Sequence, residues 1–525
     1  MPSLVAAVDV GSSNARAGLF DLHGHLVRRA EAPFATAHPM TDHAEHSSDD
    51  IWRAVCRAMR QALAESKVSP EDVKGLAFDA TCSLVMLDRL GAPVTASTTG
   101  DDTCNVVMWA DHRATAEAEE MTATRHRVLD HVGGVMSPEM ELPKLLWLKR
   151  HLPDAWRRYG MALDLTDFLT WKATGSVAVS ACTVTCKWTY LNHEEPGWQQ
   201  DFLTRIGLAD LQQKLALPPA ATPIGSPAGT LTAEAAGQLG LSPACMVGVG
   251  AIDAHAGGIG VLGGFTGAEF DSHLAMIAGT STCHMAVSPN PRPIPGVWGP
   301  YYGAMLPGLW LNEAGQSATG ALLDHILDWH SEGRALGSDR HAVMAARIEG
   351  ALTAQGPAYA GNLHVLPDFH GNRSPLADPD AVGVIHGLRL DASPRSLDQL
   401  YYATAIGIAL GTRHIVDALN QHGYRISHLH LTGGHAASPF LVQLYADAGN
   451  LSVVLPEQSD GVLLGTACVA AAACGLHASV GDAARSMVRG GRTVSQNPAL
   501  REFFDHRYRA FLLMHEQRGA LTCLQ

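Results

Sequence analysis

The first residues alternate short apolar runs with clusters of turn-forming residues. Positions 4–8 and 15–20 are mainly apolar, and Gly, Ser and Asn fill 11–14 between them. A second turn at 21–24 precedes a third run at 25–29. Short apolar runs bounded by Gly, Asn and Ser are typical of strands joined by tight turns. We therefore predict three strands, with a loop rich in hydrogen-bond donors in the first turn.

The pattern then changes to a helical period. Apolar residues recur three to four positions apart over 51–62, behind the polar, acidic turn 48–50, which predicts a capped helix. The next apolar run, 73–78, predicts a buried strand. The polar cluster 79–83 follows it, at the edge of the sheet where open α/β folds bind their ligands.

Two segments organise the middle of the chain. Residues 115–245 carry helical patterns and many aromatic side chains, which indicates an insertion into the first domain. The glycine-rich segment 247–264 follows, and we interpret it as a hinge because glycine absorbs large backbone changes. A chain of 525 residues is too long for one core. We therefore expect two domains, 1–264 and 265–525.

A similar order of elements restarts after this boundary. The apolar run 273–278 ends in Gly279-Thr-Ser-Thr282, much as 5–10 ends in Gly11-Ser-Ser13. This internal repetition suggests a duplicated α/β unit with a nucleotide held between the halves.

The remaining pattern predicts a β-α-β-α succession. In order, we expect a helix at 401–420, a strand at 426–431, a turn at 432–434, a helix at 440–448 started by Ser438 and Pro439, a strand at 452–456 and a helix at 462–473.

Composition restricts the class of function. The chain is 46% hydrophobic and 17% charged, with a net charge of −14 and no stripe of Lys and Arg, so we expect no nucleic-acid partner. The ten cysteines are scattered, which fits reduced thiols in the cytoplasm better than disulfides. Residues 1–11 lack the basic start of a signal peptide, and no apolar stretch is long enough to span a bilayer. We therefore expect a cytoplasmic protein that does not bind membranes.

The first turn carries candidate phosphate chemistry. Glycine lets the backbone approach a phosphate, hydroxyl and amide groups can donate to its oxygens, an arginine can neutralise its charge, and an aspartate at the strand end can hold magnesium through water. The residues concerned are Gly11, Ser12, Ser13, Asn14, Arg16 and Asp9. An ordinary hairpin is an equally weighted alternative for this segment.

Two later turns have the same character. Gly279, Thr280 and Ser281 follow the strand predicted at 273–278, and Gly433 and Gly434 follow the strand predicted at 426–431. Three donor-rich turns at the ends of strands support one another as a nucleotide site. No G-x-x-x-x-G-K-[ST] sequence occurs, so a P-loop kinase is disfavoured.

Six motifs in a fixed order give the chain a family resemblance. They are DVGSSNAR at 9–16, WADHR at 109–113, PKLLWLK at 143–149, GVGAIDAHAGGIG at 248–260, IAGTST at 277–282 and LTGGHAASPFLVQLYAD at 431–447. Over nearly its whole length the chain resembles the FGGY family of carbohydrate kinases, closest to its D-ribulokinase branch. Ser12 departs from the Thr common in the family but keeps the hydroxyl.

The resemblance implies a fold and a reaction. It implies two actin-like (ribonuclease-H-like) α/β domains, the first binding sugar and the second nucleotide, with the cleft between them, and it implies ATP and Mg²⁺ as cofactors. Asp253 would be the general base that takes the proton of the attacking sugar hydroxyl. A helix-capping aspartate is the structural alternative for Asp253. Gly320, at the end of NEAGQSATG, is counted with the nucleotide-binding residues.

The resemblance also indicates the sugar pocket. Trp109, Asp111, Lys187 and Glu313 stand in motifs similar to those of ribulokinases and would bind a polyol beside Asp253. Without the resemblance, a core Trp, a surface Lys and a helix-capping Glu are about as well founded.

Our prediction of the substrate rests on the loop Thr81-Cys82-Ser83. This loop differs from the Gly-Gln type of xylulose and glycerol kinases and resembles the branch that acts on D-ribulose, so we expect phosphorylation of D-ribulose to D-ribulose 5-phosphate. Two alternatives stay open: a kinase for ribitol, L-ribulose or another pentose derivative, and an actin-like nucleotide-dependent switch without sugar kinase activity. The expected partner is a small-molecule sugar, with a homodimer as a further hypothesis.

Two pairs of metal-ligand type occur close together. Cys182 and Cys186 are four residues apart, and His428 and His430 alternate on one predicted strand. Neither pair has a second pair at zinc-site spacing, so we do not expect a structural zinc ion.

Overall fold

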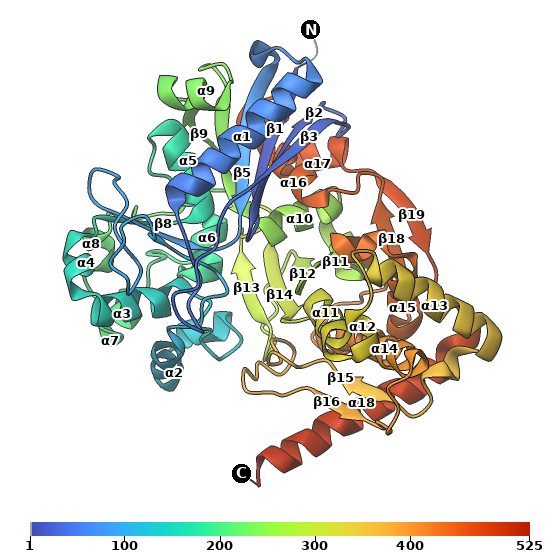
Figure 1. Ribbon diagram of the computed structural model, residues 1–525. Helices are drawn as coiled ribbons and strands as arrows, with labels where there is room; N and C mark the ends of the chain where they lie inside the picture. The colour runs from blue at the N-terminus through green and yellow to red at the C-terminus, as the bar shows by residue number, and fades with distance from the viewer. Residues whose placement is uncertain (1–2, 525) are drawn as a thin grey trace.

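Two mixed sheets organise the computed structural model, which describes residues 3–524 (Figure 1). The first sheet has the order β3-β2-β1-β5-β10-β9. Its strands are β1 (Leu4–Val10), β2 (Asn14–Phe20), β3 (Leu26–Pro33), β5 (Val73–Ala80), β9 (Pro227–Thr230) and β10 (Met246–Ile252). The second sheet has the order β13-β14-β12-β11-β17-β18-β19. Its strands are β11 (His273–Ala278), β12 (Thr282–Ser288), β13 (Trp298–Tyr302), β14 (Trp310–Gln316), β17 (His428–Thr432), β18 (Ser452–Pro456) and β19 (Gly490–Val494).

The two sheets repeat one topology. In the first, β1 pairs antiparallel with β2 and parallel with β5; in the second, β11 pairs antiparallel with β12 and parallel with β17. The predicted duplication of an α/β unit is therefore confirmed, as is the expectation of a two-domain α/β fold.

Helices cover both faces of the first sheet. Neighbouring side chains of a strand point to opposite faces. On β5, Phe78 lies against Trp52 of α1 (Ser48–Ser66), with ring centroids 6.4 Å apart. A Cβ on Gly75, three residues earlier, would meet Ala470 of α16 (Gly461–Ala473). The apolar faces of α1 and α16 therefore enclose the sheet between them.

The glycine-rich segment 247–264 does not form a hinge loop. It forms β10 and the helix α10 (Asp253–Leu262). Its glycines allow α10 and α16 to pack with their backbones in contact: a Cβ on Gly260 would lie 1.8 Å from the carbonyl oxygen of Gly461, and one on Gly465 would lie 1.8 Å from that of Ala256. The hinge interpretation was wrong. Glycine is needed both where the backbone must bend freely and where two helices pack closely, and this segment is a case of close packing.

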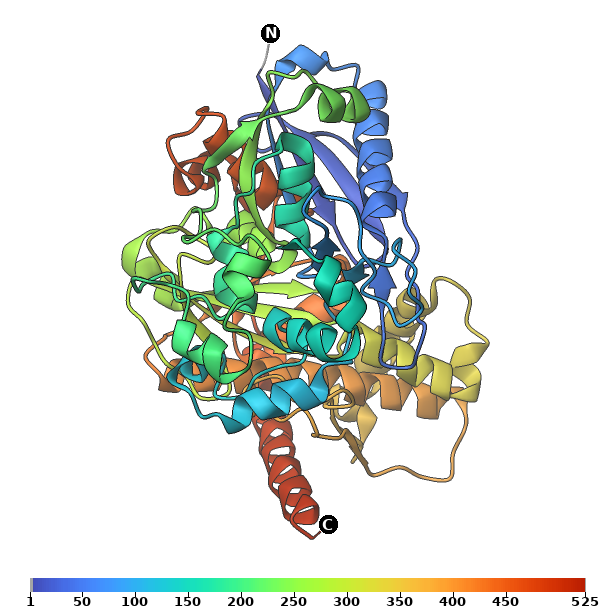
Figure 2. The same ribbon diagram turned by 90° about the vertical axis from the view of Figure 1, so that its left-hand side faces the viewer.

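The predicted helical insertion lies between β5 and β10. A small sheet of order β4-β7-β6-β8 joins it to the first lobe. The strands of this small sheet are β4 (Glu45–His46), β6 (Leu84–Leu87), β7 (Val106–Val107) and β8 (Met161–Asp164). The helices of the insertion are α2 (Thr115–Ala123), α3 (Glu141–His151), α4 (Pro153–Arg158), α5 (Leu165–Thr174), α6 (Ala181–Lys187), α7 (Gln200–Arg205), α8 (Leu211–Lys214) and α9 (Ala233–Leu239). These teal and green helices face the viewer in Figure 2.

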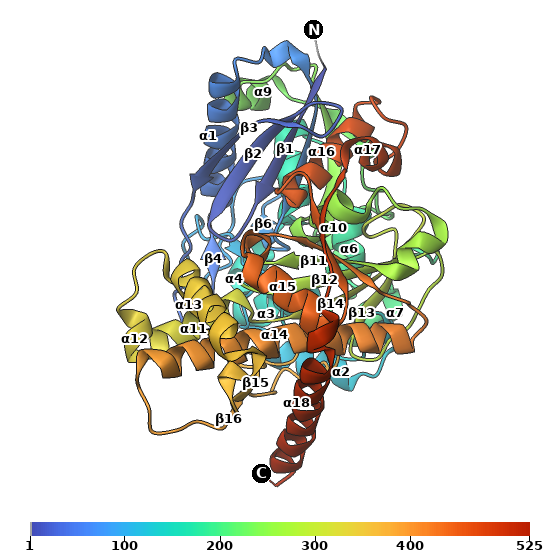
Figure 3. The same ribbon diagram turned by 90° about the vertical axis from the view of Figure 1, so that its right-hand side faces the viewer.

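The second lobe is built around a long helix, α14 (Pro394–Gln421), seen below the second sheet in Figure 3. This helix starts seven residues before the predicted start at 401, because Ser393 caps it and Pro394 occupies its first position. The predicted start of α15 (Pro439–Gly449) is confirmed, since the Ser438 hydroxyl accepts a hydrogen bond from the Leu441 amide.

The remaining helices and strands of the second lobe lie around this framework. They are α11 (Gly320–Trp329), α12 (Ser331–Arg334), α13 (Arg340–Gln355), α18 (Arg501–Thr522), β15 (His364–Leu366) and β16 (Val384–His386). Figure 1 shows α18 leading away from the second lobe to the C-terminus.

The expected domain boundary at residue 264 lies in the connection between α10 and the short helix η3 (Gly267–Ser272). The packing, however, does not follow the order of the chain. Side chains of α16 and of α17 (Val480–Met487) belong to the core of the first sheet. A late segment therefore returns to the first lobe and joins the two lobes. Among the helices of residues 3–524, none combines the length and the apolar character that a membrane span needs.

Candidate functional site

A cavity of about 490 Å³ lies between the lobes and takes walls from both. This volume is in the range of small-molecule sites. Of the residues expected from the sequence, the cavity wall includes Gly11, Ser12, Arg16, Thr81, Cys82, Trp109, Lys187, Asp253, Gly279, Thr280, Ser281, Glu313, Gly433 and Gly434. The fold therefore brings together the three donor-rich turns and most of the expected sugar-binding side chains.

Asp253 stands at the point where β10 ends and α10 begins. Its Oδ1 accepts a hydrogen bond of 2.6 Å from the Ala254 amide, which orients the carboxylate at the head of the helix. Burial raises the pKa of Asp253 to about 6, and the negative charge of Asp9 acts in the same direction. A carboxylate with a pKa near neutrality is suited to accept a proton at physiological pH.

Two further carboxylates lie behind Asp253. The strand register sets Asp9 of β1 beside Asp79 of β5, and β10, which ends at Asp253, is the next strand. Burial raises the pKa of Asp9 although the facing Arg16 opposes this, and burial together with the charge of Asp9 raises the pKa of Asp79 well above its usual range. The hydroxyl of Thr466 donates to Asp79. The three carboxylates form an acidic floor.

This floor could hold a divalent cation. Oδ1 of Asp9 and Oδ1 of Asp79 are buried and accept no hydrogen bond within residues 3–524. Carboxylate oxygens are the ligands that Mg²⁺ prefers, and it commonly binds through water. The expected role of Asp9 therefore fits its surroundings, although Asp9 itself lies behind the cavity wall.

The phosphate-type turns differ in how they face the cavity. Gly433 has φ of 91°, and a Cβ there would lie 2.5 Å from the carbonyl oxygen of Ala278, so only glycine fits against the turn at 279–281. Ser12 is held by the Trp109 indole, whose Nε1 donates to its hydroxyl at 3.0 Å. Ser13, Asn14 and Gly320 do not reach the wall. Gly320 instead starts α11, and its amide donates to Gly279 at 3.1 Å.

Cationic and aromatic side chains meet at the other end of the cavity. Lys187 Nζ lies 4.4 Å from the centroid of the Trp298 ring, and the Arg373 guanidinium lies 4.1 Å from the same centroid. Arg373 also pairs with Glu313 of β14. Positive Arg373 and Lys187 lower the pKa of Glu313 against the opposing effect of burial. Lys187 is only 3% exposed, which excludes a surface lysine.

Sequence reasoning missed several residues of the wall: Arg29, Glu139, Cys283, Arg373, Ser459 and Asp460. The pKa of Glu139 falls to about 2, because the neighbouring His112, 3.8 Å away, and the charges of Arg373 and Lys187 outweigh its burial. Glu139 and Arg373 stand in loops with no periodic pattern. The one signal that the sequence offers for them is a charged residue within a loop, and this signal is weak because charged residues are common in loops.

Some residues of the loop at 81–83 and its neighbours line the cavity, and others hold the lining residues in place from behind. The Ser83 hydroxyl lies 3.1 Å from the Thr81 hydroxyl and accepts a hydrogen bond from the Trp109 amide, so Ser83 positions the two residues that reach the cavity. Asp111 lies off the wall and is completely buried. It binds Arg113, which also binds Glu45. Asp111 therefore supports the insertion from behind the cavity rather than facing into it.

Family models match both halves of the chain. The model described as "FGGY family of carbohydrate kinases, N-terminal domain" matches residues 4–260, and its C-terminal counterpart matches residues 274–474. An FGGY carbohydrate kinase domain-containing protein of Danio rerio is 45% identical and covers 98% of this chain and 98% of its own length.

Two further relatives extend the comparison. The D-ribulokinase of Saccharomyces cerevisiae is 35% identical over 89% of this chain and 71% of its own. The crystal structure of xylulose kinase from Rhodospirillum rubrum is similar with a TM-score of 0.80, at 23% identity and with 99% of each chain covered. At that identity the structural likeness establishes the fold alone.

Proposed function

Because the chain belongs to the FGGY family of carbohydrate kinases and is an ATP-dependent sugar phosphotransferase, we propose that it phosphorylates a ketopentose, D-ribulose, at its 5-hydroxyl. The observation that carries this proposal is Asp253, a half-buried carboxylate on the cavity wall between donor-rich turns and the charged end. A kinase for ribitol, L-ribulose or another pentose derivative is the second candidate.

The residues divide the reaction between them. Asp253 takes the proton of the sugar hydroxyl as its oxygen forms a bond to the γ-phosphorus. The bond from that phosphorus to the bridging oxygen breaks, and ADP leaves. The turns at 11–12, 279–281 and 433–434 are suited to hold the phosphates with amides and hydroxyls, and Arg16 adds positive charge beside them.

Magnesium belongs to the same proposal. Asp9 and Asp79 would hold the ion through water, because Oδ1 of each is buried at the floor and accepts no hydrogen bond within residues 3–524. The ion, when bound, neutralises charge on the transferring phosphoryl group. Asp253 stays free for proton transfer, since its own Oδ1 is oriented by the Ala254 amide.

The charged end fits a keto sugar. Lys187 and Arg373 offer donors to a carbonyl oxygen and to hydroxyls, while Glu139 and Glu313 accept from hydroxyls. Trp109 offers an apolar ring at the wall, to which Thr81 and Cys82 also contribute. The loop Thr81-Cys82-Ser83 and the similarity to the yeast D-ribulokinase both favour D-ribulose.

A panel of sugars tests the proposal. ADP release is followed with D-ribulose, L-ribulose, ribitol, D-xylulose and glycerol, each with ATP and Mg²⁺. We expect the highest kcat/KM with D-ribulose, because sites built on hydrogen bonds discriminate strongly between hydroxyl patterns. A higher value with another pentose derivative would replace D-ribulose as substrate, and a complete lack of sugar-dependent ADP release would refute the proposal.

We place the reaction in the cytoplasm, since all ten cysteines are free thiols.

A further inference from the structure

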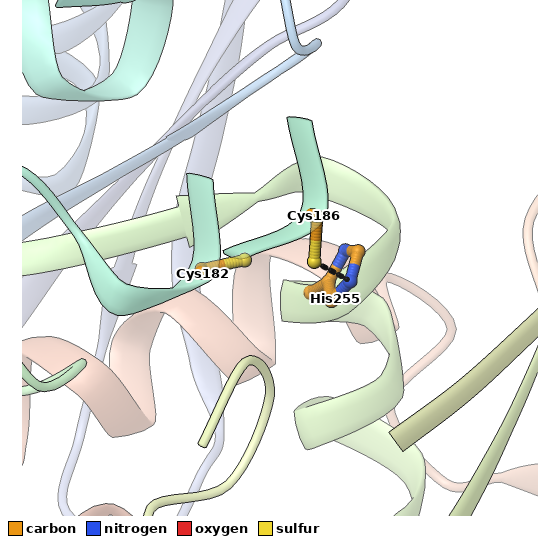
Figure 4. A group of neighbouring side chains, drawn as sticks. All are labelled: Cys182, Cys186 and His255. Atoms are coloured by element: carbon orange, nitrogen blue, oxygen red, sulfur yellow. Dashed lines mark hydrogen bonds between the residues drawn. The ribbon is translucent and has the colours of Figure 1, made fainter. Parts of the chain in front are cut away.

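Three side chains that the proposed reaction does not use converge between two helices (Figure 4). Cys182 and Cys186 belong to α6, and His255 belongs to α10. One donor atom of each lies within 4.8 Å of the other two, and Cys186 Sγ lies 3.3 Å from His255 Nε2. All three residues are completely buried. Among residues 3–524 this is the one group of its kind.

The fold fixes these positions. Residues four apart lie on the same face of a helix, so both thiols of α6 point toward α10. Ser180 caps α6 and donates to the Gly250 carbonyl at 2.7 Å, which anchors the helix to β10. The Cys182 sulfur accepts a hydrogen bond from the Ile252 amide at 3.4 Å. The cluster is therefore held in place before any ligand arrives.

One donor separation in the cluster matches that of a tetrahedral metal site. Zinc binds Cys sulfur at about 2.3 Å and His nitrogen at about 2.0 Å, which sets neighbouring S and N donors roughly 3.5 Å apart. The distance of 3.3 Å between Cys186 Sγ and His255 Nε2 is close to this separation. Two sulfurs and one imidazole are donors that favour zinc and other thiophilic ions over Mg²⁺.

A carboxylate adjoins the cluster on the side of His255. Glu313 Oε2 is buried, accepts no hydrogen bond within residues 3–524, and lies 3.6 Å from His255 Nε2. Its other oxygen, Oε1, is bound by Arg373. Glu313 also lines the cavity, as does Lys187, which directly follows Cys186. The cluster therefore lies next to the cavity, with Glu313 between the two.

We propose that Cys182, Cys186, His255 and Glu313 form a binding site for a thiophilic divalent cation such as Zn²⁺, and that its occupation inhibits sugar phosphorylation. On binding, both thiols become thiolates, their two protons pass to solvent, and no electron is transferred. The ion draws Glu313 away from the cavity and fixes the first turn of α10, two residues from Asp253. The inhibitory part rests on the proposed function; the binding part does not.

Cobalt tests the binding part without any enzyme assay. Full-length, tag-free, reduced protein is titrated with Co²⁺ without oxygen, and the thiolate-to-cobalt charge-transfer band is recorded. We expect a band at one equivalent that Zn²⁺ abolishes. Cys182→Ser and Cys186→Ser should each weaken Co²⁺ binding by at least about tenfold. Cys245→Ser is the matched control, because this buried cysteine precedes β10 and does not belong to the cluster.

The outcomes separate the two proposals. No thiolate band in the wild-type protein, or an undiminished band in both cluster variants, would overturn the metal site whatever the enzyme does. If the band is as expected, one equivalent of Zn²⁺ should lower sugar-dependent ADP release of the wild-type protein and of Cys245→Ser, but not of Cys186→Ser. Equal inhibition of all three would overturn the inhibitory role. Thermal unfolding of each variant checks that it is folded.

Discussion

Asp253 is the general base in the proposed reaction. Replacing it by Asn keeps the shape and the hydrogen bond from the Ala254 amide but removes the proton acceptor. We expect Asp253→Asn to lower kcat by about 10²- to 10⁴-fold, the usual contribution of a general base. ADP affinity, measured by calorimetry, should stay unchanged because the phosphate turns are untouched. Wild-type turnover in this variant would contradict the assignment.

The raised pKa of Asp253 gives the reaction a pH dependence. With a pKa of about 6, its carboxyl is mostly protonated at pH 5 and mostly ionised at pH 7. Only the ionised form accepts a proton, so kcat/KM should fall about tenfold from pH 7 to pH 5. Steady-state rates across this range check the expectation. A flat profile would show that another group, or no group, accepts the proton.

Arg373 is a residue that the sequence did not point to. It binds Glu313 and lies over Trp298 at the charged end of the cavity. Arg373→Met should lower kcat/KM for the sugar by about 10- to 100-fold, because each hydrogen bond to a charged group contributes about 1.5–3 kcal/mol. Arg485→Met is the control, since Arg485 forms an exposed ion pair with Asp482. Equal kinetics in the two variants would remove Arg373 from the sugar site.

At the scale of elements, the contact between α10 and α16 sets the position of Asp253. Gly465→Ala would push a Cβ against the Ala256 carbonyl oxygen, 1.8 Å away. Overpacking of this kind typically costs 1–3 kcal/mol, so we expect a lower unfolding temperature and a reduced kcat. Gly237→Ala in α9 is the matched control. It has open space around its Cβ and should stabilise the helix by about 1 kcal/mol. Equal melting temperatures would contradict the packing argument.

At the scale of the whole molecule, the cavity takes walls from both lobes, so its two ligands should help each other to bind. Asp460 already joins the lobes, lying 3.3 Å from Arg29 Nε and 3.8 Å from Arg16 Nη1. We expect a non-hydrolysable ATP analogue with Mg²⁺ to tighten sugar binding by about 5- to 150-fold, and the sugar to tighten nucleotide binding equally. Calorimetry measures both. Independent binding would mean that the lobes do not act as one site.

Local patterns predicted much of the fold. The strand β18 (Ser452–Pro456) has the bounds expected for it, and Ser438 caps α15 as expected, because apolar runs and caps depend on near neighbours. The sequence also predicted the duplicated order of strands, since the same kind of turn joins the two strands of each hairpin. The glycine pattern of 247–264 led to a wrong prediction of a hinge, because the glycines there allow two helices to pack closely.

By itself, the sequence determined the α/β class, the donor-rich turns and the family to which the chain belongs. These depend on short motifs whose order is written in the chain. Only the tertiary structure decided that Glu139 and Arg373 line the cavity, that Asp111 lies off its wall, and that Cys182, Cys186 and His255 meet. The reason is physical: these contacts join residues far apart in the chain, and burial and charge at such places depend on the packing of both lobes.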